Sequence, residues 1–434
     1  MSDINHRNYH TRLEQIQRIT KQYNLQVSTI TPVAYQELGP CPYNNFIYKL
    51  ELSEPASNSS FHNPNEPLTP CTTSPPDRTL TYILRMSNPL AMGINPHASR
   101  IENEVAAMSL ARQGLESYRP GLGNLIPKIY TFCSRPSHPD DLPWVLMECK
   151  SGVPLDEFFP SQSKTIKKSI IEQVADILSG LRSCPLPPGI TYGGLGLSSD
   201  GSVISAEMTT TNGGPWPTYE ILLKARLQHE LHDSDASPAI NGWRDSGVRE
   251  RLESLINRFT VPNLSDSDTR VLIHGDLTMN NILIDPSTCK LTALIDFDFA
   301  CIAHPVHEFL VSLQDLGGNV MGPYGEDPTE GKLSQALLSG DFGDDDVPGD
   351  LWWVGKTLNA CLVKRGVLRP SDVDGMKVLC EWRALELLVC PFHLAAEFIV
   401  KRMSEEAREG AKRGGEGELV AKMGDLEEVM GDSC

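Results

Sequence analysis

The stretch VLIHGDLTMNNILIDPSTCKLTALIDFDFA, residues 271–300, decides the fold of this chain. Three short apolar runs alternate in it with polar turns, a pattern that predicts buried strands joined by tight loops. The runs are residues 271–273, 282–284 and 291–295. Asp276, Asn281 and Asp296 stand near the ends of these runs. Because a strand end holds its side chain rigidly, we expect the three polar groups to line one cleft.

These three residue types together can carry out phosphoryl transfer. One carboxylate can accept the proton of an attacking hydroxyl group. A carboxamide and a second carboxylate can share Mg²⁺, a hard cation that prefers oxygen ligands. That combination is the chemistry of kinases. The alternative is a polar turn between core strands, in which the Asp and Asn side chains only cap backbone groups.

His274, Gly275, Asp276 and Asn281 match the pattern H-G-D-x-x-x-x-N. The stretch resembles the catalytic loop and metal-binding Asp of the aminoglycoside phosphotransferase family, within the protein-kinase-like superfamily. The resemblance implies that Asp276 is the catalytic base and that His274 is a structural residue of the catalytic loop. It also implies that Asn281 and Asp296 are ligands of Mg²⁺. Protein kinases usually carry Arg after the His, so Gly275 favours the small-molecule branch.

The resemblance covers about residues 30–400 and implies an α+β, bilobal protein-kinase-like fold. We expect a small antiparallel-sheet N-lobe over residues 1–147 and a mainly helical C-lobe, catalytic and substrate-binding, over residues 148–403. Residues 404–434, rich in Glu, Lys and Gly, are expected to form a charged tail that is weakly helical or disordered. Residues 53–78 are rich in Ser, Pro, Asn and Thr, which predicts a disordered insert between two strands.

In the kinase-like scheme, the strand over residues 81–86 carries the basic residue that holds the nucleotide phosphates. Arg85 is the candidate, because Arg is always charged and can bind phosphate with two donors, although Lys is usual at this place. Lys49, on the preceding strand, is the alternative. Glu104, on the amphipathic helix that follows, resembles the Glu that pairs with this basic residue. Glu102 is its neighbouring alternative.

Two further segments of the expected nucleotide site follow from the resemblance. Glu148, Cys149 and Lys150 end an apolar strand and resemble the family's hinge, which binds adenine through backbone groups. The hairpin around Gly39 takes the place of the loop that covers the phosphates, but it lacks the pattern G-x-G-x-x-G. Backbone N–H groups of residues 43–45 are the expected donors to phosphate there.

Acidic and histidine residues follow the metal-binding Asp. Asp298 is expected to support the metal site or to brace the loop. Glu308 matches the position of an acidic residue that braces the catalytic loop in the family, although Asp is more usual there. His304 and His307 have no further partners at metal-ligand spacing, and we interpret them as surface or capping residues. The triplet Asp341–Gly343 spells the metal motif of protein kinases, but it follows no strand, so Asp296 is preferred.

The composition limits the classes of partner. The chain has 434 residues, 40% of them hydrophobic, and a formal net charge of −18, which argues against general nucleic-acid binding. Its 11 cysteines are odd in number and form no CxxC pair, which favours reduced thiols. The N-terminus lacks the apolar core of a signal peptide, and no apolar run is long enough to span a membrane. We therefore expect a cytoplasmic protein without nucleic-acid or membrane partners.

The leading functional hypothesis is an ATP-dependent phosphotransferase that moves the γ-phosphoryl group to a hydroxyl of a small metabolite, with ATP and Mg²⁺ as cofactors. The alternative is a catalytically weak or inactive kinase-like scaffold or regulatory protein, favoured by the missing glycine-rich loop and by Arg in place of Lys. A protein kinase is a third reading, opposed by Gly275. The long low-complexity insert resembles a fungal member of the family more than a bacterial resistance enzyme. The acceptor, the choice between ATP and GTP, and the oligomeric state stay open.

Overall fold

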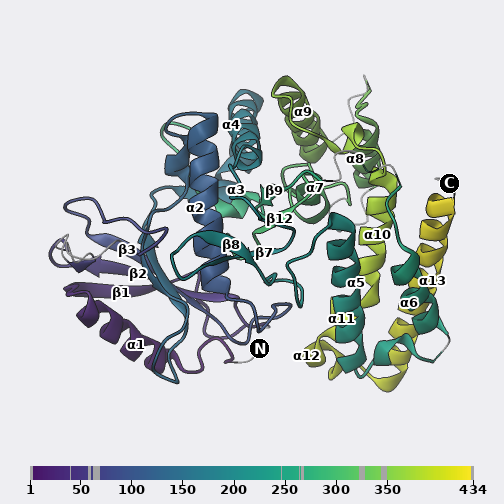
Figure 1. Ribbon diagram of the computed structural model, residues 1–434, viewed down its shortest axis with the longest axis horizontal. Helices are drawn as coiled ribbons and strands as arrows, with labels where there is room; N and C mark the ends of the chain where they lie inside the picture. The colour runs from purple at the N-terminus through teal and green to yellow at the C-terminus, as the bar shows by residue number, and fades with distance from the viewer. Residues whose placement is uncertain are drawn as a thin grey trace.

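The computed structural model describes residues 3–39, 41–56, 60–61, 69–245, 247–262, 264, 268–321, 328–343 and 349–431. A twisted sheet with two helices forms the N-terminal part, and helices predominate in the rest (Figure 1). This arrangement confirms the expected α+β fold with a sheet lobe and a helical lobe. None of the helices in the described ranges is long and apolar enough to cross a membrane.

The N-terminal elements are α1 (Tyr9–Gln22), β1 (Val27–Val33), β2 (Asn45–Leu52), β3 (Thr81–Ser87), α2 (Arg100–Tyr118), β4 (Ile129–Cys133) and β5 (Trp144–Glu148). The elements up to the catalytic stretch are β6 (Val153–Pro154), α3 (Leu155–Phe158), α4 (Lys164–Arg182), β7 (Gly194–Leu197), β8 (Val203–Ala206), α5 (Tyr219–Ala236) and α6 (Val248–Arg258). The rest are β9 (Val271–Ile273), β10 (Ile282–Asp285), β11 (Lys290–Leu294), β12 (Cys301–Ala303), α7 (His307–Val311), α8 (Pro328–Ser339), α9 (Asp350–Lys364), α10 (Met376–Val389), α11 (Phe392–Ala395), α12 (Glu397–Val400) and α13 (Glu405–Gly431).

The N-terminal sheet is antiparallel, with strand order β1-β2-β3-β5-β4. Side chains alternate between its two faces because the strand period is two residues. Tyr82, Leu84 and Met86 of β3 lie in one buried cluster with Ile16 and Ile19 of α1, which therefore covers that face. The odd-numbered residues of β3 point to the opposite face, toward α2 and the catalytic stretch.

Helix α2 joins the sheet to the helical lobe (Figure 1). Most of its side chains are buried, on several sides, and they belong to the large hydrophobic core that also contains α4, α5 and α10. At Gly114 the approach to α4 is so close that a Cβ atom would lie 2.6 Å from the carbonyl oxygen of Gly180. This contact fixes the position of α2 relative to the helical lobe.

The catalytic stretch forms three short strands, as its apolar runs predict. β10 pairs with β11, and β9 pairs with β12, all antiparallel. Ile282 is opposite Leu294 in the first pair, and the backbone N–H of Ile295 donates to the carbonyl oxygen of Asn281 at 2.9 Å. Asn281 and Asp296 therefore stand at the same end of this ribbon.

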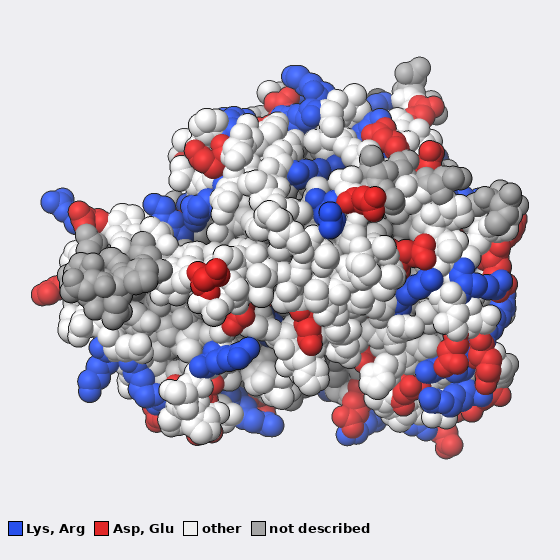
Figure 2. Space-filling view, in the orientation of Figure 1, with Lys and Arg blue, Asp and Glu red and all other residues white. Residues whose placement is uncertain are grey.

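The expectation of a weakly helical or disordered C-terminal tail is wrong. Residues Glu405–Gly431 form one helix, α13, which packs beside α10 and α6 (Figure 1). Four apolar side chains on one face of α13 are buried: Leu419, Met423, Leu426 and Val429. Glu427 on α13 also accepts from Arg251 of α6 at 2.6 Å. Glycines and charged residues hide this apolar stripe in the sequence. On the face seen in Figure 2, positive and negative side chains are interspersed around these helices.

The expected disordered insert is only partly described. Residues 57–59 and 62–68 lie outside the described ranges. Residues 69–78 do not behave as expected, because the N–H of Thr73 donates to the carbonyl oxygen of Ile129 at 2.9 Å and Pro75 is buried. This end of the insert is attached to β4.

Replacing Leu426 of α13 by Ala should destabilise the protein by about 2–5 kcal/mol, because it removes a fully buried side chain and leaves a cavity. Val420→Ala is the matched control, since Val420 lies on the same helix and is 38% exposed. The free energy of unfolding in urea measures both. Equal, small effects of the two substitutions would contradict the packing of α13.

Candidate active site

The loop between β9 and β10 requires glycine at position 275. Gly275 has φ +82°, and a Cβ atom there would lie 2.4 Å from the carbonyl oxygen of Phe299. An L side chain is disfavoured by the backbone conformation and excluded by the space. The position therefore cannot hold the Arg that protein kinases usually carry in this place.

Glu308 of α7 braces the catalytic loop, as expected. Its carboxylate accepts from the backbone N–H groups of His274, at 2.8 Å, and Gly275, at 3.1 Å, and the Ser312 hydroxyl also donates to it. The ring of His274 is fully buried, and its Nε2 donates to the carbonyl oxygen of Ile295 at 3.1 Å. His274 thus ties the loop to the residue before Asp296.

Asp276 and Asn281 lie in direct contact. The amide nitrogen of Asn281 donates to the Asp276 carboxylate at 2.8 Å and to the Asp276 backbone carbonyl at 2.9 Å. Burial raises the pKa of Asp276 above its usual value, although His274 and the hydrogen bond from Asn281 oppose the shift. A carboxylate with a raised pKa is a better proton acceptor near neutral pH.

Arg85 is the buried centre of the site. Its guanidinium forms ion pairs with Glu104 of α2, with Asp296 at 3.0 Å and with Asp298 at 3.3 Å. The side chains of Arg85, Glu104 and Asp298 are each at most 5% exposed, whereas that of Asp296 is 39% exposed. Asp296 has φ +65°, a left-handed conformation that turns the chain after β11. One buried cation therefore joins a strand, a helix and the segment that carries the expected metal ligand.

Arg100, which the sequence reasoning missed, forms a second cationic centre beside Arg85. Its guanidinium donates to Asp298, to the side-chain oxygen of Asn45 at 3.1 Å and to the backbone carbonyl of Asn44 at 3.0 Å. Burial alone would raise the pKa of Asp298, but Arg85 and Arg100 together hold it below its usual value. A position four residues before Glu104, on the same helical face, is the signal that could have identified Arg100.

The hairpin that covers the expected phosphate region is held from two sides. Asn5, which is fully buried, accepts from the N–H of Tyr43 at 2.8 Å and donates to the carbonyl of Cys41 at 2.9 Å. The expectation that the N–H of Tyr43 faces phosphate is therefore wrong, because Asn5 occupies it. A cavity of about 230 Å³ between this hairpin and Asp296 is the space next to the carboxylate.

The alternatives for the basic residue and its partner are distinguished by their contacts. Lys49 binds Glu51 at 2.7 Å, away from the carboxylate cluster. Glu102 accepts from the Ser134 hydroxyl at 2.7 Å and not from Arg85. The structure therefore pairs Arg85 with Glu104. The alternatives Lys49 and Glu102 have other partners and do not belong to this ion-pair cluster.

Of the three residues expected to form the hinge, Glu148 is the last residue of β5, and Cys149 and Lys150 follow it. A side-chain oxygen of Glu148 accepts from the N–H of Lys128 at 3.1 Å, and the ammonium of Lys150 donates to the carbonyl of Asn124 at 2.6 Å. Both side chains are thus engaged in hydrogen bonds to the protein's own backbone. Cys149 lies between them and is half-buried.

His304 and His307 are both buried, so they are not surface residues, but the capping interpretation holds for His304, whose Nδ1 accepts from the N–H of Val306 at 3.3 Å. His304 stacks on Tyr219, and Nδ1 of His307 shares a hydrogen bond of 2.9 Å with the Tyr219 hydroxyl. Burial lowers the pKa of His307 well below its usual value, so its ring is neutral. These rings are part of the buried core at the start of α7.

The two carboxylates of Asp276 and Asp296, the carboxamide of Asn281 and the guanidinium of Arg85, which pairs with Asp296, are the kinds of group that phosphoryl transfer uses. The chain belongs to the phosphotransferase enzyme family, whose sequence pattern matches residues 72–335.

Similarities to individual proteins are more limited. The chain is 33% identical over 54 residues to acyl-CoA dehydrogenase family member 11 of Homo sapiens and over 52 residues to that of Mus musculus. These segments cover 12% of this chain and only 7% of the length of each relative.

Solved structures with a similar fold include three at low identity. A candidate aminoglycoside phosphotransferase of Ralstonia eutropha has a TM-score of 0.48 at 14% identity, with 96% of this chain and 98% of that chain covered. A ternary complex of APH(2")-IIa with streptomycin and ATP has a TM-score of 0.47 at 12% identity, with 95% of this chain and 97% of that chain covered. A complex of APH(4)-Ia with ADP and hygromycin B has a TM-score of 0.43 at 10% identity, with 94% of this chain and 97% of that chain covered.

Glu308→Ala should destabilise the protein by about 3–5 kcal/mol, because two buried backbone N–H groups and the Ser312 hydroxyl lose their acceptor. Glu308→Gln keeps one acceptor oxygen and should lose clearly less. Urea unfolding of the three proteins provides the comparison. Equal stability of Glu308→Ala and the wild type would show that the loop does not depend on this brace.

Proposed function

We propose that this phosphotransferase moves the γ-phosphoryl group of ATP to a hydroxyl of a small metabolite. The observation that carries the proposal is the contact between the Arg85 guanidinium and the Asp296 carboxylate, next to the Asp276–Asn281 pair. Membership of the phosphotransferase enzyme family supports it. Phosphoryl transfer needs mainly positioning and charge neutralisation, and these groups can provide both.

Asp276 is the proposed catalytic base. Its carboxylate would accept a hydrogen bond from the acceptor hydroxyl and then take the proton as the phosphoryl group leaves ATP. The hydrogen bond from Asn281 fixes the orientation of one carboxylate oxygen. The backbone brace at Glu308 holds the loop on which Asp276 stands. His274 would act only through this loop, as a positioning residue.

Arg85 is the proposed phosphate-binding residue, and Glu104 would orient it. The guanidinium carries five donors, so it can bind phosphate oxygens while it keeps its bond to Glu104. The backbone of residues 148–150 would bind the adenine ring at the hinge, which we place at the junction of two lobes near residue 147.

The donor chemistry of the site fits Mg²⁺. Asn281 and Asp296 offer oxygen atoms at the same end of the β10–β11 ribbon, and Mg²⁺ is commonly held by one or two carboxylates with water and phosphate oxygens. Within the described ranges no group of three or more His, Cys, Asp or Glu side chains is suited to hold a metal ion. The cation would therefore depend on nucleotide phosphates for most of its ligands. When bound, Mg²⁺ would neutralise charge on the transferring phosphate.

Asp276→Asn should lower kcat by about 10²–10⁴-fold and leave the KM for ATP little changed, because the amide cannot accept the proton. ADP release with a panel of hydroxylated metabolites as acceptors measures this. Asp341→Asn is the control, since Asp341 is exposed and belongs to the triplet rejected on spacing. Full activity of Asp276→Asn would exclude Asp276 as the base.

Arg85→Lys should raise the KM for ATP about tenfold, because a charge remains but the paired donors to phosphate and Glu104 are lost. Lys49→Ala should leave this KM unchanged. Initial rates against ATP concentration decide between the two residues. A larger effect of Lys49→Ala would transfer the phosphate-binding role to Lys49.

A further inference from the structure

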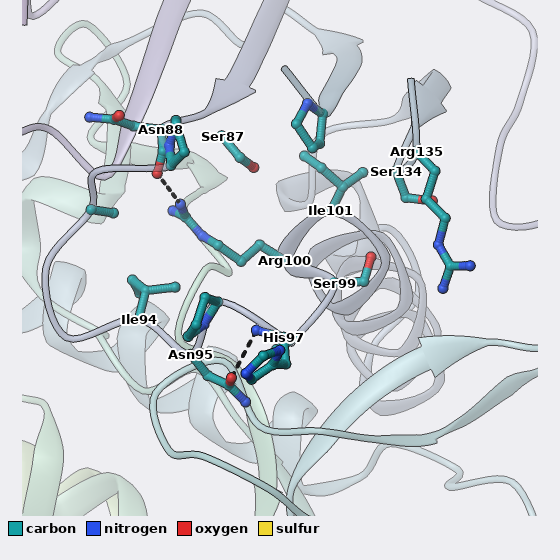
Figure 3. Close-up of a pocket in the computed structure, with 15 residues that line it drawn as sticks. Ser87, Asn88, Ile94, Asn95, His97, Ser99, Arg100, Ile101, Ser134 and Arg135 are labelled. Atoms are coloured by element: carbon teal, nitrogen blue, oxygen red, sulfur yellow. Dashed lines mark hydrogen bonds between the residues drawn. The ribbon is translucent and has the colours of Figure 1, made fainter. Parts of the chain in front are cut away.

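A cavity of about 350 Å³ lies where the β3–α2 loop meets the first turn of α2, the end of β4 and the start of β5 (Figure 3). Its lining includes Arg100, Arg135 and His97. None of the described residues that line it is Asp or Glu. In a chain with a net charge of −18, this wall carries no carboxylate, and its positive charge comes from Arg135, since the guanidinium of Arg100 is paired with Asp298.

The first turn of α2 presents hydrogen-bond donors to this cavity. The helix is 19 residues long and begins at Arg100. Its N-cap, Ser99, accepts from the N–H of Glu102 at 3.4 Å. The N–H groups of Arg100 and Ile101 have no acceptor within the helix, and both residues line the cavity. Unpaired N–H groups and the positive end of the helix dipole favour an anion at such a place.

Ser87 is an independent sign of a ligand. Its side chain is on the α2 side of β3, and the residue is only 8% exposed. Its Oγ is buried and has no hydrogen-bond partner among the described residues. Figure 3 shows this hydroxyl pointing into the ring of lining residues. A buried hydroxyl without a partner is unfavourable, and an anion in the cavity would accept its proton.

We propose that this cavity binds a small anion that carries a phosphate or carboxylate group. The N–H groups of Arg100 and Ile101 and the hydroxyls of Ser87 and Ser99 are the donors, and Arg135 on the rim adds positive charge. Glu102, in the same turn, does not line the cavity, and its carboxylate accepts from Ser134. The volume exceeds that of a bare anion, so a metabolite that bears the anionic group fits as well.

The position of the site links it to the catalytic centre. Arg100, whose N–H is one of the proposed donors, holds Asp298 and Asn45 with its side chain. Glu104 binds Arg85 one helical turn further along α2. An anion at the first turn and phosphates at Arg85 would therefore act on the same helix, and any coupling between them is reciprocal.

Titration calorimetry with three probes tests the proposal: inorganic phosphate, glycerol 3-phosphate and lactate. They distinguish a free phosphate, a phosphomonoester and a carboxylate as the recognised group. Saturating Mg·AMP-PNP is added in a parallel series, so that an anion bound at Arg85 is displaced and an anion in the cavity is not. We expect at least one probe to bind wild type in both series.

Two substitutions assign the site. Ser87→Ala should weaken binding by about fivefold and leave the unfolding temperature of the ligand-free protein unchanged or higher, because an unpartnered hydroxyl is removed. Ala98→Glu, which places a carboxylate in the lining, should abolish binding, whereas Val363→Glu, on the exposed face of α9, should not. Failure of all three probes to bind wild type would overturn the proposal, and so would binding that survives Ala98→Glu. Neither result would decide the proposed phosphotransferase activity, because the substituted residues Ser87, Ala98 and Val363 lie outside the candidate active site.

Discussion

A single buried guanidinium holds the candidate active site of this protein together. Arg85, from a strand of the N-terminal sheet, forms ion pairs with Glu104 of α2 and with Asp296 and Asp298, which follow β11. Three carboxylates that share one cation cannot all be satisfied unless the sheet, the helix and the β11 segment keep their relative positions. Removing one partner from a buried ion pair typically costs about 3–5 kcal/mol. The cluster therefore resists separation of the two lobes, and it presents donors beside the one carboxylate that is partly exposed.

Helix α2 makes this arrangement rigid. It carries Glu104 and Arg100 on the side of the cluster, and it approaches α4 closely at Gly114. Arg100 also holds Asn44 and Asn45 of the covering hairpin. A hairpin without a glycine-rich loop can thus be fixed over the cleft by side chains that reach it from elsewhere, Arg100 on one side and Asn5 on the other. The missing glycines favoured a scaffold in the sequence analysis, and in the structure these side chains hold the hairpin in place without them.

Local patterns in the sequence predicted the parts of the molecule that local chemistry determines. The three strands of residues 271–294 follow from apolar runs between turn residues. Gly275 is part of the matched sequence motif, and its positive φ and close contact with Phe299 explain why glycine stands there. Long-range contacts were not accessible in this way. The occupation of the Tyr43 N–H by Asn5 joins positions 38 residues apart, and nothing near Tyr43 in the sequence indicates it. The buried stripe of α13 was hidden because glycines and charges lower the helical signal, while packing on α10 determines the outcome.

Thermal unfolding with Mg·ATP, on the wild type and on Asp296→Ala, tests the central claim most directly, because it needs no knowledge of the acceptor. At a hundredfold excess over its dissociation constant, a nucleotide should stabilise the folded state by about 2.7 kcal/mol. The account predicts a shift of this size in wild type that requires Mg²⁺ and that disappears in Asp296→Ala. A folded wild-type protein that shows no shift with any nucleotide would contradict the phosphotransferase account and favour a kinase-like scaffold.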